Sequence, residues 1–220
     1  MQIKIIRKHV KNIIIKIKEI NVVEIVAPNF VTKDRIDDIL NLRASWIEQK
    51  FKELEQDEAN KIKLENGDLI SFLGKNYKLA VEVGEKNGVE LINDTIILTC
   101  SLDSDFIKKD KILNDWYRQR AKEIFTEILS RFCLVVGKEI KSIKIRKMKT
   151  RWGSCNSKKA YINLNLELIK KPITAIEAVI MHELTHLYHA NHSKAFYNTL
   201  LNFMPDYYDR IKILKANRIV

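Results

Sequence analysis

Apolar and polar residues alternate through the first 26 positions, as in IKIIRKHV and NIIIKIKEI. Side chains of a strand point alternately to its two faces, so this period of two predicts two strands, joined as a hairpin, over residues 2–26. Between residues 32 and 60 the apolar positions recur at helical spacing, which predicts one long helix. Alternation returns over 67–100, where two Asn-Gly pairs indicate turns between further strands.

The second half of the chain begins with another amphipathic helical pattern, from about residue 108 to residue 133. Strands are predicted at 140–149 and at 161–167. A helix is expected after Pro172, and a last helical stretch is expected from about Lys194 onward.

The segment SLDSD at 101–105 is the best candidate for a boundary between two parts. It would separate a β-rich N-terminal part, 1–105, from a C-terminal part, 106–220, although the two could also pack as one domain. The pattern predicts an α+β fold, with a β-rich N-terminal part that contains one long helix. A compact core of helices and a small sheet would follow it.

Four of the five histidines lie in the segment MHELTHLYHANHS, and its centre is an H-E-x-x-H motif at His182, Glu183 and His186. Residues four apart share one face of a helix, so the two imidazoles can bind one metal ion. Glu183 borders the same face and can accept a proton from water on the metal. Zinc suits this chemistry because it lowers the pKa of bound water to near 7. The motif therefore predicts a zinc-dependent hydrolase with one Zn²⁺ per chain.

The surroundings of the motif indicate a genuine helix rather than two surface histidines. Thr174 and Glu177 match the T-x-x-E capping box. An apolar stripe lies behind the expected metal face, at Ile176, Val179, Ile180, Leu184 and Leu187.

Two histidines compete for the position of third ligand. His189 is seven residues beyond His182, about 10.5 Å along a straight helix, so its side chain would converge poorly on the same ion. His192 follows Asn191, a residue type that tolerates a left-handed turn, and a chain that breaks there can return His192 to the metal. We therefore favour His192, with His189 at the rim, behind the ligands or in solvent.

A net charge of +11 and a pI near 9.4 favour anionic partners, which include nucleic acids, nucleotides and membrane surfaces. Because 29 of the 39 basic residues are lysines, an ordinary solvated surface explains the charge as well. No apolar run approaches the roughly 18 residues that span a bilayer. Charges interrupt the N-terminal segment, so a cytoplasmic location is expected. The three cysteines are widely spaced and suggest no disulfide framework.

Beyond the histidines, the chain carries RWGSC at 151–155, INLN at 162–165 and NHS at 191–193. With HELTHL at 182–187, this combination resembles the YgjP-like metallopeptidase-domain family, and weaker similarity extends over most of the chain. That family is similar to zincin-like HExxH peptidases of the SprT and WLM kind. The resemblance implies a zincin-like core, zinc at His182, His186 and His192, and a catalytic Glu183. Some members of the family look like nucleotide pyrophosphohydrolases that act on UTP.

Further candidate site residues lie upstream of the motif. As a strand, the segment KSIKIRKMKTRW would point Lys147, Lys149 and Arg151 to one side, as an anion-binding wall or as a solvated edge. Arg151 is the strongest of these, because it begins the RWGSC motif and could stabilise an oxyanion or bind a phosphate. Asn163 and Asn165 are candidate substrate-binding residues on a strand that could pair with an extended peptide, or else the polar face of a hairpin.

Three functions therefore stay open at the level of sequence. A metallopeptidase is favoured, because H-E-x-x-H is best understood in that chemistry. A nucleotide pyrophosphohydrolase would use the same metal, with basic side chains on the phosphates. A basic nucleic-acid-binding module with structural zinc is disfavoured, because no fourth ligand is evident; Cys155 is expected to be a packed residue.

Overall fold

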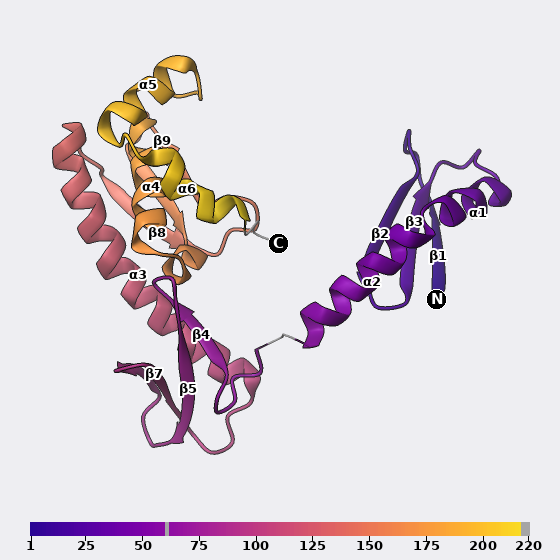
Figure 1. The fold of residues 1–220 in the computed structure, drawn as a ribbon, viewed down its shortest axis with the longest axis horizontal. Helices are drawn as coiled ribbons and strands as arrows, with labels where there is room; N and C mark the ends of the chain where they lie inside the picture. Colours follow the sequence, from indigo (N-terminus) through magenta and orange to yellow (C-terminus); the bar gives the residue numbers. More distant parts are fainter. Residues whose placement is uncertain (60–61, 217–220) are drawn as a thin grey trace. The chain divides into compact units, whose positions relative to one another are not determined.

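The computed structural model of the protein describes residues 1–59 and 62–216 (Figure 1). The chain forms two compact units, Met1–Ile62 and Lys63–Val220. Helices and mixed sheets occur together, so the predicted α+β class is confirmed. The division lies upstream of SLDSD, and 101–105 falls inside the second unit, because the strands before it share one hydrophobic core with the helix after it. No helix within 1–59 or 62–216 is both long and apolar enough to cross a membrane.

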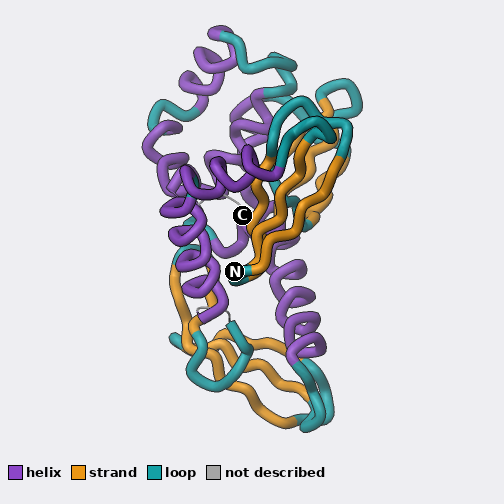
Figure 2. The backbone as a smooth tube through the Cα atoms, turned by 90° about the vertical axis from the view of Figure 1, so that its right-hand side faces the viewer, coloured by secondary structure: helices purple, strands orange, loops and turns teal. Residues whose placement is uncertain are grey.

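The first unit is a three-stranded sheet with two helices (Figure 2). Its elements are β1 (Gln2–Arg7), β2 (Ile14–Glu19), β3 (Val22–Ala27), α1 (Lys33–Leu42) and α2 (Ala44–Ala59). The sheet order is β1-β3-β2, and β1 lies parallel to β3. The prediction of two strands was wrong, because the chain turns once more at Asn21, where φ is +62°, and residues 2–27 form three strands. The single predicted helix is interrupted at Arg43.

The second unit begins with a four-stranded sheet packed against a long helix. Its strands are β4 (Leu69–Phe72), β5 (Lys75–Val83), β6 (Gly88–Ile92) and β7 (Thr95–Cys100), in the order β4-β5-β7-β6. Helix α3 (Phe106–Val136) extends from this sheet to the part of the unit that holds α4 (Figure 1). One hydrophobic cluster joins these elements and includes Leu98, Phe125, Ile162 and Ile176. The site is therefore supported by a continuous core.

A second sheet of three strands lies nearer the site, with β10 (Tyr161–Asn165) between β8 (Ser142–Arg146) and β9 (Gly153–Asn156). β10 is parallel to β8 and antiparallel to β9. Both predicted strands are shorter than expected. The strand predicted at 161–167 ends at Asn165. The side-chain oxygen of Asn165 accepts a hydrogen bond from the Glu167 amide and so caps a 3₁₀ helix, η1 (Leu166–Lys170).

Three helices complete the unit: α4 (Ile173–Thr185), α5 (Lys194–Phe203) and α6 (Tyr207–Ala216). The predicted capping box is wrong, because α4 starts from Pro172 without a side-chain cap and Glu177 bonds instead to Arg131 of α3 and Arg210 of α6. The predicted last helix is divided in two around Pro205, which lacks the amide hydrogen that a continuing helix needs.

Candidate metal centre

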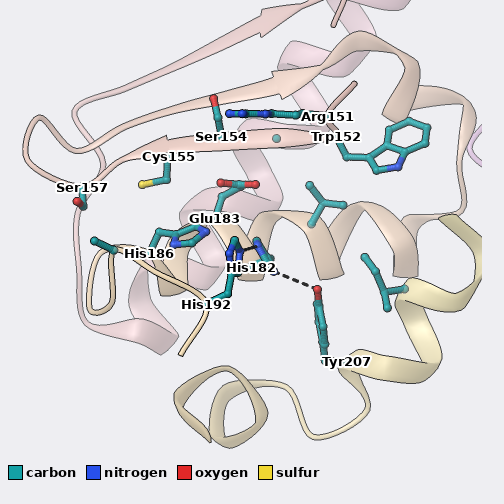
Figure 3. A pocket seen from close by; sticks show the side chains of 14 residues that line it. Arg151, Trp152, Ser154, Cys155, Ser157, His182, Glu183, His186, His192 and Tyr207 are labelled. Atoms are coloured by element: carbon teal, nitrogen blue, oxygen red, sulfur yellow. Dashed lines mark hydrogen bonds between the residues drawn. The ribbon is translucent and has the colours of Figure 1, made fainter. Parts of the chain in front are cut away.

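Three imidazoles meet on one side of α4 (Figure 3). His182 lies in α4, His186 at its C-cap, and His192 in the loop just before α5. One nitrogen from each falls in a group whose members all lie within 4.8 Å of one another. The Nε2 atoms of His182 and His192 are 2.9 Å apart. The structure therefore brings together the three histidines that the sequence analysis favoured.

The chain returns to the site by a route that the sequence analysis did not anticipate. Helix α4 ends at Thr185. The amides of Tyr188 and His189 both donate to the Thr185 carbonyl, so the chain turns directly after the end of the helix. Asn191 does not adopt the left-handed conformation that its residue type tolerates, since it is not among the described residues with positive φ. His192 then immediately precedes Ser193, the N-cap of α5.

His189 contributes its main chain rather than its side chain to this arrangement. Its carbonyl oxygen lies 3.0 Å from Nδ1 of His186 and accepts a hydrogen bond when that nitrogen carries the proton. The His189 ring points elsewhere, with its Nε2 2.9 Å from the hydroxyl of Thr199 on α5. When Nδ1 of His186 donates to this carbonyl, the Nε2 atom of His186 keeps the lone pair that can bind a metal ion.

Two aromatic residues support the imidazoles, and the sequence analysis assigned a role to neither. The buried Phe196 ring has its centroid 4.9, 4.7 and 4.9 Å from the rings of His182, His186 and His192. Tyr207 at the start of α6 places its hydroxyl 3.0 Å from Nδ1 of His182. Tyr207 is 25 residues from His182, so no helical spacing could link the two.

Burial favours the neutral form of these histidines. Desolvation, with smaller contributions from His186 and His192, lowers the pKa of His182 to about 4. Desolvation also lowers the pKa of His186, against the effect of the His189 carbonyl. Neutral imidazole is the form that binds metal ions, so the donor set suits a transition metal.

Glu183 lies beside the histidines and is 5% exposed. Figure 3 shows its carboxylate pointing away from the α4 axis toward β9. Burial raises the pKa of Glu183 to about 8, while the Arg151 guanidinium acts in the opposite direction. A carboxyl group tuned in this way can take up and release a proton near neutral pH.

These groups share one pocket of about 580 Å³. Arg151, Glu183, Tyr207 and the three histidines line it, together with the residues of β9 from Gly153 to Cys155. Cys155 is a free thiol, and burial raises its pKa to about 11, with Glu183 adding to the shift. The pocket thus combines an imidazole cluster, a buried carboxylate and one exposed cation.

The other predicted substrate-side residues lie outside this pocket lining. Strand β8 ends at Arg146, so Lys147 and Lys149 belong to an exposed loop and not to the predicted strand. Asn163 is half-buried and donates to the Ser154 hydroxyl at 3.1 Å.

Asn165 is fully buried, and its side chain forms hydrogen bonds with main-chain groups. Its amide nitrogen donates to the carbonyls of Met148 and Arg151, at 2.8 and 2.9 Å. Its oxygen accepts from the amides of Met148 and Glu167, at 3.3 and 3.2 Å. Asn165 therefore holds the 148–151 loop in place, and Arg151 sits at the end of that loop.

Comparison with known proteins gives a family match over nearly the whole chain. The family described as YgjP-like, metallopeptidase domain, matches residues 11–217. No curated protein matches the chain.

Similar solved structures include two metallopeptidase zymogens. One is abylysin of Pyrococcus abyssi, with 20% identity and a TM-score of 0.38 over 44% of this chain and 99% of that chain. Another is jannalysin of Methanocaldococcus jannaschii, with 29% identity and a TM-score of 0.33 over 42% of this chain and 89% of that chain.

Proposed function

The chain belongs to the YgjP-like metallopeptidase-domain family, and from that membership we propose that it is a zinc-dependent peptidase. The proposed ligands are His182, His186 and His192, and the proposed general base is Glu183. The observation that carries the proposal is the convergence of three imidazole nitrogens beside a buried carboxylate in one pocket.

The donor set fits one zinc ion per chain. Two nitrogens bound to a tetrahedral zinc at about 2.0–2.1 Å lie about 3.3 Å apart, close to the 2.9 Å between His182 and His192. Catalytic zinc sites use three protein ligands and leave one position open, which matches three histidines without a fourth donor among the described residues. Bound there, zinc supplies a Lewis acid that acidifies a water molecule and polarises a carbonyl group.

Glu183 moves the proton in the proposed reaction. As the water oxygen bonds to the carbonyl carbon of the scissile peptide, a carboxylate oxygen of Glu183 accepts the proton that the water loses. The same carboxyl group then delivers the proton to the departing amine nitrogen as the C–N bond breaks. Burial raises the pKa of the Glu183 carboxyl group and so favours its uptake of a proton, while the guanidinium of Arg151 acts in the opposite direction and keeps the ionised form accessible.

The substrate chain is proposed to pair with β9 and not with the 161–167 strand of the sequence analysis. β10 is hydrogen-bonded to β8 on one side and to β9 on the other, so it has no edge free for a peptide. β9 is an edge strand of its sheet, and its residues Gly153, Ser154 and Cys155 line the pocket. An extended peptide added there gains main-chain hydrogen bonds beside Glu183.

The nucleotide alternative has weaker support. It requires several cations around the phosphates, but only Arg151 of the three basic candidates lines the pocket. Arg151 serves a peptidase equally well, because its guanidinium can stabilise the negative charge that develops on the carbonyl oxygen.

A paired assay tests the proposal. Wild type and Glu183→Gln are each offered an unfolded protein and, separately, nucleoside triphosphates. We expect wild type to cleave the protein, and we expect Glu183→Gln to keep its zinc but lose cleavage, because an amide cannot accept the proton. Pyrophosphate release that depends on Glu183, without any cleavage of protein, would overturn the proposal in favour of nucleotide hydrolysis.

A further inference from the structure

Tyr207 is a buried residue of α6 that lines the pocket and places its hydroxyl against His182. Figure 3 shows it on the far side of His182 from Glu183, joined to His182 by a hydrogen bond. We propose that Tyr207 is a positioning residue that fixes the ring orientation and tautomer of His182, and that α6 is thereby a working part of the metal site. This inference rests on the proposed zinc site.

The direction of the hydrogen bond follows from which nitrogen faces the other ligands. Nε2 of His182 lies 2.9 Å from Nε2 of His192, so it is the atom directed into the cluster. A neutral imidazole that offers Nε2 to a metal carries its hydrogen on Nδ1. Nδ1 therefore donates to the Tyr207 hydroxyl oxygen, 3.0 Å away. Such an outer partner holds the ring at one angle and increases the basicity of the ligand nitrogen.

Tyr207 is itself held in place on both sides. Its ring lies at 23° to the His182 ring, with the centroids 6.0 Å apart. One turn along α6, Arg210 bonds to Glu177, and Glu177 also receives Arg131 from α3. Because Glu177 belongs to α4, the helix that carries His182, the hydroxyl is fixed relative to the ligand that it contacts.

The two histidines of the motif thus obtain their outer partners from different sources. His186 uses a main-chain carbonyl three residues away, which no substitution can remove. His182 depends on a side chain from another helix, so one substitution separates its ring from its partner while all three ligands stay in place.

The neighbouring tyrosine offers a matched control. Tyr208 is 47% exposed, and its ring stacks with that of Tyr197 at 6.3 Å. Within 1–59 and 62–216, no hydrogen bond joins it to a histidine. Tyr208→Phe removes the same hydroxyl group from the same helix, one residue along.

The experiment measures zinc affinity of the full-length chain by competition with a chelator, and the visible spectrum of the Co²⁺-substituted protein. For Tyr207→Phe we expect 10- to 100-fold weaker zinc binding, the range typical of a lost outer partner, and a changed Co²⁺ spectrum. Tyr208→Phe should match wild type in both. Unchanged affinity and spectrum in Tyr207→Phe would overturn the inference.

A measurement on the wild-type protein covers the case in which Tyr207→Phe fails to fold. Long-range ¹H–¹⁵N NMR of the zinc-loaded protein should show His182 protonated at Nδ1, and coordination through Nδ1 would overturn the inference. If wild type binds no zinc, the proposed function fails together with it. If wild type binds zinc tightly and Tyr207→Phe does too, only the inference about Tyr207 fails.

Discussion

A Cβ atom built on Gly153 would lie 2.6 Å from Oε1 of Glu183. The same Cβ atom would lie 2.7 Å from Cγ and 2.9 Å from Cδ of Glu183. The backbone of β9 therefore packs directly against the proposed base. The φ angle of Gly153 is outside the left-handed region, so the glycine is required by space and not by backbone conformation.

Replacing Gly153 with alanine should displace the Glu183 carboxylate and leave the imidazole cluster in place. A misplacement of about 1 Å can cost about 10²-fold in rate, so we expect kcat to fall by about that factor. Zinc content should stay near one per chain. Turnover of an unfolded protein and metal analysis of the same sample measure the two effects.

Gly88→Ala is the matched control, because a Cβ atom on this strand residue of β6 meets no atom within 4 Å. It should leave kcat unchanged. Normal turnover in Gly153→Ala would show that the position of the Glu183 carboxylate does not limit the reaction.

Substitution of the third proposed ligand should separate two nearby histidines. His192→Ala removes one of three clustered nitrogens and should lower zinc affinity by orders of magnitude. His189→Ala keeps the main-chain carbonyl that bonds to His186, so its affinity should stay within a few-fold of wild type. Chelator competition ranks the two, and the reverse order would contradict the assignment.

Asn165→Ala should destabilise the protein by about 3 kcal/mol, because the buried Asn165 amide makes three hydrogen bonds to main-chain groups of the 148–151 loop and all three are lost. Asn163→Ala removes a single bond, to the half-buried Ser154, and should cost about 1 kcal/mol or less. Urea unfolding of both variants provides the comparison. Equal effects would mean that Asn165 is not the anchor of the loop.

The clustering of the three histidines could be predicted from sequence because they are close together in the chain. The spacing within HELTH placed two imidazoles on one side of a helix, and the resemblance to the YgjP-like family is confirmed over residues 11–217. The helices at α3 and α4 followed from their apolar periodicity. These signals depend on residues a few positions apart.

Most of the missed features that shape the site depend on contacts between distant segments. Nothing in the pattern shows that β1 pairs in parallel with β3, or that β10 is enclosed by strands on both sides. Asn165 looked like a substrate-binding residue on a strand face, yet its amide is used up by main-chain groups. Tyr207 reaches His182 only through the packing of α6 on α4.

The three proposed ligands are confined to a short stretch of chain, with His182 and His192 only ten positions apart. Closing so short a loop costs little chain entropy, so a metal ion can gather these side chains before distant segments have assembled. Glu183 belongs to the same stretch, but the position of its carboxylate depends on contact with β9, which lies some 30 positions earlier in the chain. The three proposed ligands are thus brought together by a short segment, whereas the position of the proposed base also requires a distant strand.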